Sequence, residues 1–589
     1  MTINKRDKWL ARPASRIFNR LGLPPALGLA CMASLLAVLP ASAADYNITS
    51  YGAVANDTGY DTLEIQAAID AAYNAGGGRV IIPSGKFIST GVILKNNVTL
   101  RLDTSTSVLE GSPTYAYYRN DIFINASGGS NKRIEGPGRI DGVNCYNANG
   151  EEGFRGPHCI DFTNCNGFSA VDITITNSGN FALRAQGTTG GTQNVTIQNV
   201  KIRGGHDGLH INGATNVTVT GCDFQTGDDA FAGNDNRTVT VTDCQINSSC
   251  NGMRLGVDGL TVKRCRFWGP GQYPHRSSGN YIMDSAYCYM SAVDRNPTIP
   301  GDNVLFEYCA VENTAQIFAY SFGSLWQEGQ VLKNVTFRNV TATGIVGNEA
   351  FKVNGDTGKQ FNLTLEAVDI GFTSGSGRYC ISLNQFGTAT MKAVTLRNGG
   401  DCWVASFSSG NYVKTNRVAV VPSNANPIGY SSIGSITAIA LPFTSGRIFS
   451  LTPQHAKSKC LDVANFGTGD GANAQIWAYG GGSNQKWQVT DVTGGGVYEL
   501  TPQHATSKRL DVNAAASGNG VNVQIWSANG GNAQRWRLLE QGNGIYELTP
   551  LCAPYRSLDV SGASTADGAN VCIWQDADGN NQRWKLQTP

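Results

Sequence analysis

Four similar phrases decide the fold: Asn194-Val-Thr-Ile-Gln-Asn-Val-Lys-Ile202, Asn216-Val-Thr-Val-Thr-Gly-Cys-Asp-Phe224, Thr238-Val-Thr-Val-Thr-Asp-Cys-Gln-Ile246 and Gly259-Leu-Thr-Val-Lys-Arg-Cys-Arg-Phe267. They begin 22, 22 and 21 residues apart. Each alternates apolar with polar residues and is rich in β-branched side chains, which is typical of a strand. A strand that repeats at this interval predicts a parallel solenoid, in which successive coils hydrogen-bond at ~4.8 Å and alternate side chains fill the interior.

Cysteine occupies one position of this repeat in three successive coils, at Cys222, Cys244 and Cys265. Small apolar side chains stack well inside a narrow solenoid, so we expect an internal cysteine ladder there rather than disulfides or metal ligands. Several disulfides are nevertheless expected in an exported chain, although their connectivity does not follow from the sequence. The nearest cysteine pairs are Cys145 with Cys159, Cys380 with Cys402, and Cys552 with Cys572.

The first 43 residues predict an export signal. Six Lys/Arg residues precede an apolar run over 21–40, and Ala41-Ser-Ala43 supplies a cleavage pattern. The remaining chain holds 39 basic and 43 acidic residues, a net charge of −4, which gives no reason to expect nucleic acid or an anionic membrane as a partner. No later apolar run approaches the ~20 residues that span a bilayer. We therefore expect a secreted monomer.

A solenoid also needs its open end covered. Asp61-Thr-Leu-Glu64 reads as a helix capping box ahead of an apolar helical stretch over 65–72, and Gly76-Gly-Gly78 ends that helix. We expect this helix to cover the first coil.

Acidic residues form a column in this register. Asp207 lies 13 positions after Asn194, Asp229 lies 13 after Asn216, and Asn251 follows Thr238 by the same interval, with Asp228 beside them. Three carboxylates in one small patch cannot all stay ionised, so at least one pKa should be raised. A protonated acid beside an ionised base is what cleavage of a glycosidic bond requires. Aspartates also make turns between strands, but three in register favour catalysis.

Residues near this column are candidates to bind substrate. Two positions after the column, Leu209, Phe231 and Met253 suit the interior, so the next position should face outward. That places His210 and Arg254 beside the carboxylates, to bind hydroxyl groups or to tune pKa values. Arg254 could equally serve only to pair with Asp229. His206 and Asn251 complete the predicted substrate-binding set, and the loop 268–276 forms either a cleft wall or a plain connection.

Three motifs together resemble the polygalacturonase family of glycoside hydrolases over about residues 45–360. They are Tyr51-Gly-Ala53, the run Gly76-Gly-Gly-Arg-Val-Ile-Ile-Pro-Ser-Gly85, and Thr226-Gly-Asp-Asp229. The resemblance implies an all-β, right-handed parallel β-helix that uses neither metal nor cofactor. It also implies that Asp228 is the general acid, and that Asp207 and Asp229 activate water for cleavage with inversion. The ~4.8 Å between coils is itself nearer the short carboxylate separation of retaining enzymes.

Two departures from the family pattern leave the substrate open. Gly205-His-Asp207 stands where the family has Asn-Thr-Asp, and Cys250-Asn-Gly252 where it has Gly-His-Gly. The family's Arg-Ile-Lys is not found downstream. A pectic, rhamnose-containing or neutral glycan is therefore predicted, with dextranase-like or α-1,3-glucanase-like action on an α-glucan as an alternative. A β-helix polysaccharide lyase and a non-catalytic glycan-binding protein are two further readings.

A second repeat, of 48–49 residues, begins near residue 446. Each unit continues through Leu-Asp-Val to a Gln-x-Trp motif, which ends at Trp487, Trp536 and Trp584. Three such units resemble a ricin-type β-trefoil, whose tryptophans should build a shared core. We thus predict a signal peptide over 1–43, a catalytic β-helix over 44–425, a linker over 426–445 and a sugar-binding trefoil over 446–589.

By resemblance, each trefoil unit binds sugar through an aspartate, polar residues and an aromatic face. Unit one has the full set: Asp462, Gln475, Trp477, Asn484 and Gln485. Unit two has Asp511, Gln524 and Trp526 but carries Ala533 in place of the asparagine; unit three has Asp559, Trp574 and Asn581 but carries Cys572 in place of glutamine. We therefore rank the first site as the best binder and the third as the weakest.

Overall fold

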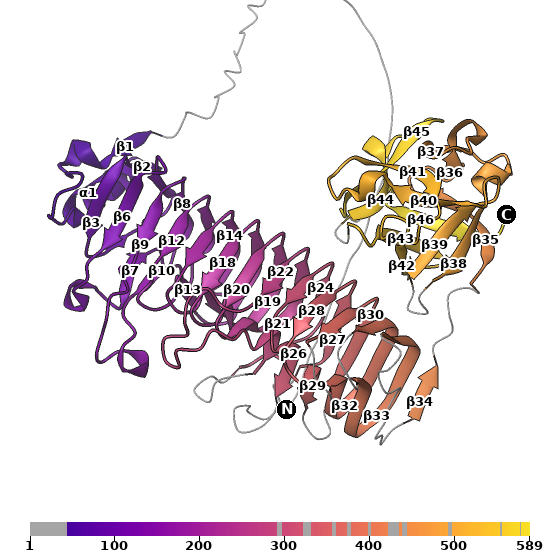
Figure 1. Cartoon of the computed structure of the whole chain (residues 1–589). Coiled ribbons are helices and arrows are strands. Elements are labelled where there is room, and N and C mark those ends of the chain that lie inside the picture. Colours follow the sequence, from indigo (N-terminus) through magenta and orange to yellow (C-terminus); the bar gives the residue numbers. More distant parts are fainter. Residues whose placement is uncertain are drawn as a thin grey trace, which may run out of the picture. The chain divides into compact units, whose positions relative to one another are not determined.

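The structure is a computed structural model, and it describes residues 44–290, 297–321, 332–355, 361–373, 378–397, 402–421, 435–438, 445–492, 497–553, 556–577 and 579–589. The predicted signal peptide and most of the predicted linker lie outside these residues. Within them, a parallel β-helix is followed by a β-trefoil, as the sequence predicted (Figure 1). No helix among the described residues is both long and apolar enough to cross a membrane.

The β-helix has three parallel faces. The first face contains β1 (Asp45–Asn47), β2 (Gly78–Ile82), β5 (Val98–Leu102), β8 (Ser130–Glu135), β11 (Asn166–Val171), β14 (Thr192–Gln198), β17 (Ala214–Thr220), the later parts of β19 (Phe231–Thr242) and β21 (Asn251–Lys263), β24 (Val304–Glu307), β27 (Asn334–Arg338), β30 (Asn362–Glu366), the middle parts of β32 (Arg378–Arg397) and β33 (Cys402–Val421), and β34 (Ser435–Ala438). The long strands β32 and β33 run through all three faces.

The second and third faces run beside the first. The second contains β3 (Gly85–Ser89), β6 (Ser107–Gly111), β9 (Arg139–Asp141), β12 (Thr174–Thr176), β15 (Lys201–Arg203), β18 (Asp223–Thr226), β20 (Gln245–Ser248), β22 (Arg266–Trp268), β25 (Ala310–Glu312), β28 (Thr341–Ile345) and β31 (Asp369–Phe372). The third contains β4 (Val92–Ile93), β7 (Ile122–Asn125), β10 (His158–Asp161), β13 (Leu183–Gln186), β16 (Leu209–Asn212), the first residues of β19 and β21, β23 (Ser285–Tyr289), β26 (Gln316–Ser321) and β29 (Glu349–Asn354).

The predicted repeat sets the register. Val195 pairs with Val217, and Val217 pairs with Val239 on the next coil. All three side chains are buried in the interior. Two of the phrases begin with an asparagine that turns a corner: Asn194 and Asn216 have φ of 55° and 58°, a left-handed conformation that asparagine tolerates. Their amides also hydrogen-bond from coil to coil at 3.3 Å.

The cysteine ladder is confirmed. Cys222, Cys244 and Cys265 are buried thiols inside the solenoid, and Cys309 continues the row on the next coil. Two of the predicted disulfides are wrong, because the members of the pairs Cys145/Cys159 and Cys552/Cys572 are separate thiols. Proximity in sequence does not bring side chains together when each coil places them on its own strand or loop. The third pair cannot be compared, since the Cys402 side chain lies outside the described residues.

The capping helix forms, but not with the predicted cap. Helix α1 (Thr62–Asn74) buries Ile65, Ala68, Ile69 and Ala72 over the first coil. The carboxylate of Asp61 makes no hydrogen bond to the helix; instead it accepts the backbone N–H groups of Val54 and Ile88. The capping box is therefore wrong, because the backbone N–H groups of Val54 and Ile88 bind the carboxylate that the helix would have used.

The trefoil has a six-stranded barrel and three covering hairpins. The closed barrel contains β35 (Arg447–Pro453), β38 (Trp487–Asp491), β39 (Val497–Pro502), β42 (Trp536–Gly542), β43 (Ile545–Pro550) and β46 (Arg583–Gln587). The hairpins are β36 (Lys459–Val463) with β37 (Ala472–Ala478), β40 (Lys508–Val512) with β41 (Val521–Ser527), and β44 (Arg556–Val560) with β45 (Ala569–Gln575).

The tryptophans of the Gln-x-Trp motifs build the trefoil core, as predicted. Trp487, Trp536 and Trp584 are fully buried. Each indole N–H donates to a leucine carbonyl of its own unit at 2.9–3.1 Å, so the polar edge of each ring is satisfied without leaving the core.

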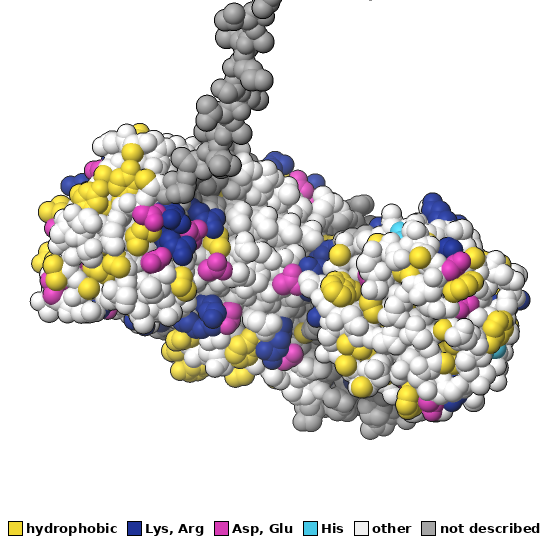
Figure 2. All heavy atoms as spheres, turned by 90° about the horizontal axis from the view of Figure 1, so that it is seen from above, with side chains coloured by type: hydrophobic (Ala, Val, Ile, Leu, Met, Phe, Trp, Pro, Cys, Tyr) yellow, Lys and Arg dark blue, Asp and Glu magenta, His cyan; other side chains and the backbone are white. Residues whose placement is uncertain are grey.

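Charged groups on the outer surface are mixed in sign. On the face shown in Figure 2, basic and acidic side chains lie next to one another. Among the ion pairs of the protein, Glu135 is shared by Arg101 and Arg133. No single-sign patch stands out on that face.

Candidate active site and carbohydrate sites

The predicted column exists. On the third face, Leu209 pairs with Phe231, and Phe231 with Met253. These side chains point inward and are fully buried. The residues two positions earlier therefore form a column along the solenoid, with one residue on each of three neighbouring coils. Carboxylate oxygens of Asp207, Asp228 and Asp229 all lie within 4.8 Å of one another. The register argument therefore located the cluster correctly.

Asp207 is enclosed by neighbouring side chains. Its Oδ2 contacts His210 Nδ1 at 2.6 Å, while its Oδ1 is buried without a hydrogen-bond partner among the described residues. The His210 ring stacks on Phe181 at 4.2 Å, which fixes the imidazole. Burial, together with the charges of Asp228 and Asp229, raises the pKa of Asp207 well above its usual range. The expectation of one raised pKa in the cluster is met at this residue.

Asp229 is bound by two residues of the next coil. Its Oδ2 lies 2.5 Å from Arg254 Nε, and its Oδ1 accepts both the side-chain and backbone N–H groups of Asn251, at 2.9 and 3.2 Å. Asn251 is fixed in turn by Ser285. Arg254 and Asn251 thus neutralise and orient this carboxylate, which is the pairing role considered for Arg254.

Asp228 contacts two cations that the sequence analysis missed. Its Oδ2 lies 2.9 Å from Arg155 Nη2 and 3.6 Å from His275 Nε2, and its Oδ1 accepts the backbone N–H of Asp229. Burial raises the pKa of Asp228, but His275 and Arg155 outweigh it and lower the pKa below the usual range. The resemblance assigns the catalytic proton to this residue, whereas the free protein holds it as a carboxylate.

Two loops bring these cations to the cluster. Arg155 is the one Lys or Arg in the loop between β9 and β10, and His275 lies in the loop after β22 that was predicted as a possible cleft wall. The loops meet through Arg276, whose guanidinium lies 5.3 Å from the Phe154 ring. The loop after β22 therefore does form a wall of the site. The sequence signal that could have identified Arg155 is that it is the one Lys or Arg in this long loop.

His206 lies beneath this wall. Its side chain is 1% exposed, and its ring lies 5.4 Å from that of Phe154. Burial and the nearby Arg155 and Arg276 lower its pKa to about 3, so it is neutral at ordinary pH. Like His210, it is placed to support the acids and is enclosed in the free protein.

The site's donors do not form a metal-ligand set. Asp228, Cys250 and His275 have ligand atoms within 4.8 Å of one another. However, His275 Nδ1 accepts the backbone N–H of Ser278 at 3.2 Å, so its hydrogen sits on Nε2 and points at Asp228. Arg155 and Arg254 already neutralise two of the acids. Positively charged side chains thus already neutralise carboxylates that would otherwise be available to a metal ion.

In the trefoil, unit one presents a complete site. Asp462 Oδ1 accepts Gln475 Nε2 at 2.9 Å, and its Oδ2 accepts Asn484 Nδ2 and Gln485 Nε2 at 2.7 and 3.0 Å. These groups line a cavity of about 380 Å³, and the Trp477 side chain beside them is 44% exposed. An oriented carboxylate beside an exposed ring suits a sugar, since hydroxyl groups bind the first and the apolar ring face packs on the second.

Units two and three lose donors in turn. Asp511 keeps Gln524 and Gln534 as partners at 3.1 Å each, beside a cavity of about 390 Å³ lined by Trp526. In unit three, Asp559 receives Asn581 Nδ2 at 2.8 Å, but Cys572 Sγ is 3.9 Å away where the other units place an amide. Burial raises the pKa of Asp559 to about 6, and its remaining partners offset this only in part. Trp574 remains exposed.

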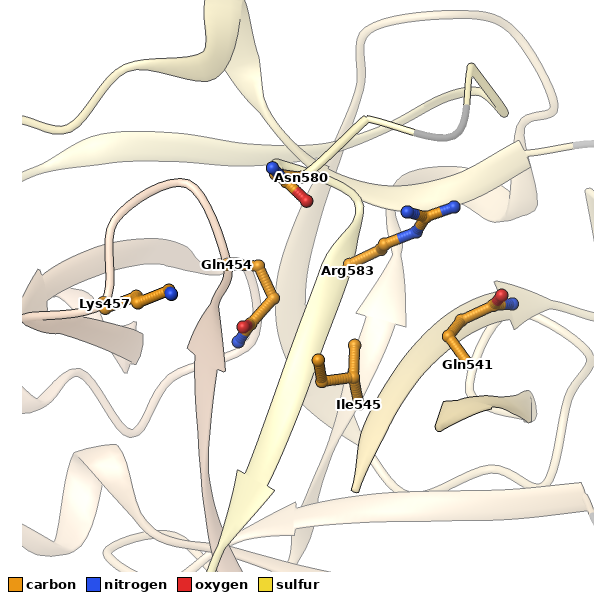
Figure 3. A pocket seen from close by; sticks show the side chains of 6 residues that line it. All are labelled: Gln454, Lys457, Gln541, Ile545, Asn580 and Arg583. Carbon is orange, nitrogen blue, oxygen red and sulfur yellow. The ribbon is translucent and has the colours of Figure 1, made fainter. Parts of the chain in front are cut away.

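A further cavity of about 270 Å³ lies apart from these three sites (Figure 3). Its lining comes from units one and three of the trefoil and from the turn joining β42 to β43. The residues are Gln454, Lys457, Gln541, Ile545, Asn580 and Arg583.

Family models match both parts of the chain. Residues 76–261 match glycosyl hydrolases family 28, and residues 191–366 match the right-handed β-helix region. Residues 443–526, 483–574 and 532–589 match the ricin-type β-trefoil lectin domain.

Individual relatives cover smaller parts. Mannuronan C5-epimerase AlgE5 of Azotobacter vinelandii is 51% identical over 47 residues, which are 8% of this chain and 5% of that protein. AlgE6 of the same organism is 30% identical over 167 residues, 27% of this chain and 16% of that one. The chain thus spans only a small fraction of these relatives.

Solved structures resemble each part separately. An exopolygalacturonase from Thermotoga maritima is 17% identical with a TM-score of 0.48, covering 60% of this chain and 91% of that one. The designed threefold protein ThreeFoil is 42% identical with a TM-score of 0.23, covering 24% of this chain and 96% of that one. The chain thus carries a region that matches glycosyl hydrolases family 28, folded as a β-helix, followed by a domain that matches the ricin-type β-trefoil lectin domain.

Proposed function

We propose that the chain hydrolyses glycosidic bonds of a polysaccharide with its aspartate cluster, while the trefoil holds it on a glycan. The observation that carries the proposal is the placement of three carboxylates within 4.8 Å, one with a raised pKa and one bound to a neutralising arginine. Asp228, the most exposed of the three at 13%, protonates the leaving oxygen. Asp207 and Asp229 hold and deprotonate the attacking water, so that cleavage proceeds with inversion.

The substrate is a pectic or related plant or microbial glycan. A neutral α-glucan is the second candidate, because Arg155 and Arg254 are engaged by Asp228 and Asp229 and are not free to bind a uronate carboxylate. Export through the segment 1–43 would bring the enzyme to such polymers outside the cell.

A glycan panel tests the substrate and the stereochemistry together. Pectic, rhamnogalacturonan and α-glucan polymers are incubated with the wild type, and products are followed by ¹H NMR from the first minutes. We expect new reducing ends from one class, first formed with the anomeric configuration opposite to that of the substrate. Retained configuration would contradict the water-activating roles, and binding without cleavage would favour a non-catalytic glycan-binding protein.

The trefoil should target the enzyme without taking part in cleavage. We expect Asp462→Ala to weaken binding to insoluble glycan at least about tenfold, because the carboxylate orients three amides of the complete site. Hydrolysis of a short soluble oligosaccharide should be unchanged. Asp559→Ala is the matched control, with an effect of less than about twofold in a pull-down assay. Equal losses in both variants would contradict the ranking of the sites.

The raised pKa of Asp559 predicts a pH-dependent stability. Because the folded pKa is about 6 against 3.8 for the ordinary group, the folded state keeps the proton between these values. This contribution to stability is present below about pH 4 and is lost as the pH rises through 6. We expect Asp559→Asn to gain about 2 kcal/mol in unfolding free energy, relative to wild type, between pH 4 and pH 7. Denaturant titrations showing a pH-independent difference would contradict it.

A further inference from the structure

Arg155 bridges Asp228, the proposed proton donor, and the carboxylate of Glu152. Its side chain is 5% exposed, and Nη2 lies 2.9 Å from Asp228 Oδ2 and 2.6 Å from Glu152 Oε1. Nη1 faces Asn180 Oδ1 at 3.5 Å and Glu151 at 3.8 Å. One nitrogen therefore bridges the two carboxylates, and the guanidinium has a ready partner on its own loop if it leaves Asp228.

The hydrogen bonds and ion pairs of Asp228 favour its anion, although the carboxylates of Asp207 and Asp229 within 4.8 Å disfavour it. Besides Arg155, the carboxylate accepts the backbone N–H of Asp229 at 2.9 Å and faces the Nε2 hydrogen of His275 at 3.6 Å. Charge-assisted contacts of this kind are the strong ones, and a proton on Asp228 would weaken them by removing the negative charge. An acid held in this way cannot protonate a leaving oxygen until its surroundings change.

Glu152 is placed to receive the guanidinium. Its side chain is 36% exposed, whereas that of Asp228 is 13% exposed, so Glu152 lies nearer the solvent edge of the site. Its Oε2 accepts the hydroxyl of Ser277, which belongs to the facing loop. Glu152 therefore connects the cation on Asp228 to both loops that enclose the cluster.

We propose that Arg155 is a positioning residue that keeps Asp228 ionised in the free enzyme and moves onto Glu152 when a glycan enters. Asp228 then takes a proton from solvent and passes it to the leaving oxygen, as the glycosidic bond breaks. The attacking water loses its proton to the carboxylates of Asp207 and Asp229, which return it to solvent. The proposal rests on the hydrolytic function proposed above, and it identifies Arg155 as the residue that controls the protonation of Asp228.

Two substitutions should move the pH profile in opposite directions. In Arg155→Gln, Asp228 loses its cation, so the basic limb of kcat/KM should shift upward by at least about one pH unit. In Glu152→Gln, Arg155 loses its competing partner and interacts more strongly with Asp228. The pKa of Asp228 should then fall, and the same limb should shift downward. Arg155→Lys keeps the charge and should rescue most of the wild-type limb. A merely structural arginine would lower activity at every pH without moving the limb.

The experiment measures reducing-end release by the full chain from pH 4 to pH 9, with thermal unfolding of each variant alongside. Opposite shifts in the two variants support the proposal. A fixed limb in both, or shifts in one direction, overturns it while leaving hydrolysis intact. If Arg155→Gln does not fold, the downward shift in Glu152→Gln decides. A wild type that cleaves no glycan overturns the proposed function, and this inference with it.

Discussion

Asp228→Asn is expected to lower kcat at least about 10³-fold, with little change in the midpoint of thermal unfolding. The amide has nearly the same shape, but it cannot give a carboxyl proton to the leaving oxygen, and general acid catalysis contributes about 10²–10⁴-fold. Loss of the buried charge also leaves Arg155 with Glu152 as its main carboxylate partner. Reducing-end release on the glycan found in the panel measures the effect.

Binding to insoluble glycan is the control for this variant. Because the complete trefoil site is built from other residues, Asp228→Asn should bind as the wild type does. A variant that keeps more than about a tenth of the wild-type rate would show that Asp228 is not the proton donor. The raised pKa of Asp207 would then make that residue the candidate to test next.

Arg254→Met should destabilise the β-helix by about 3–5 kcal/mol. Its Nε lies 2.5 Å from Asp229 Oδ2, and the Asp229 side chain is only 2% exposed. Removing one partner of a buried pair leaves an uncompensated charge, which costs far more than the pair contributes. Two further carboxylates within 4.8 Å add to the repulsion. Urea denaturation, followed by the midpoint and slope of the transition, measures the loss.

Arg237→Met is the matched control, because Arg237 of β19 forms an ion pair that is exposed to solvent. Arg237 lies 3.5 Å from Asp258, and their side chains are 46% and 37% exposed. Surface pairs contribute about 0–1 kcal/mol, so this variant should unfold nearly as the wild type does. Similar losses in both variants would mean that the charge of Asp229 is not buried as described.

The repeat made the core of the site predictable. Because Asp207 and Asp229 sit at one phase of a strand pattern, counting residues was enough to place them on neighbouring coils, and the pairing of Leu209 with Phe231 confirms that phase. The same periodicity separated inward from outward positions. In the trefoil, the repeated Gln-x-Trp motif identified the buried tryptophans for the same reason.

Contacts supplied by loops could not be predicted in this way. Arg155 lies 73 positions before Asp228, and His275 lies 47 after it, so no period relates them. The cap of α1 and the disulfides failed for a related reason. The carboxylate of Asp61 accepts backbone N–H groups outside the helix, and cysteines that are near in sequence are separate thiols in the structure. A side chain's partner depends on tertiary contacts that local patterns do not specify.

Hydrolysis by the aspartate cluster is tested most directly by following two products at once. The wild type is incubated with an acidic glycan, with and without chelator, and new reducing ends are measured together with ultraviolet absorbance of unsaturated sugars. The proposed chemistry predicts reducing ends that require Asp228 and no rise in absorbance. A rise in absorbance that chelator abolishes would instead show that the chain cleaves by elimination.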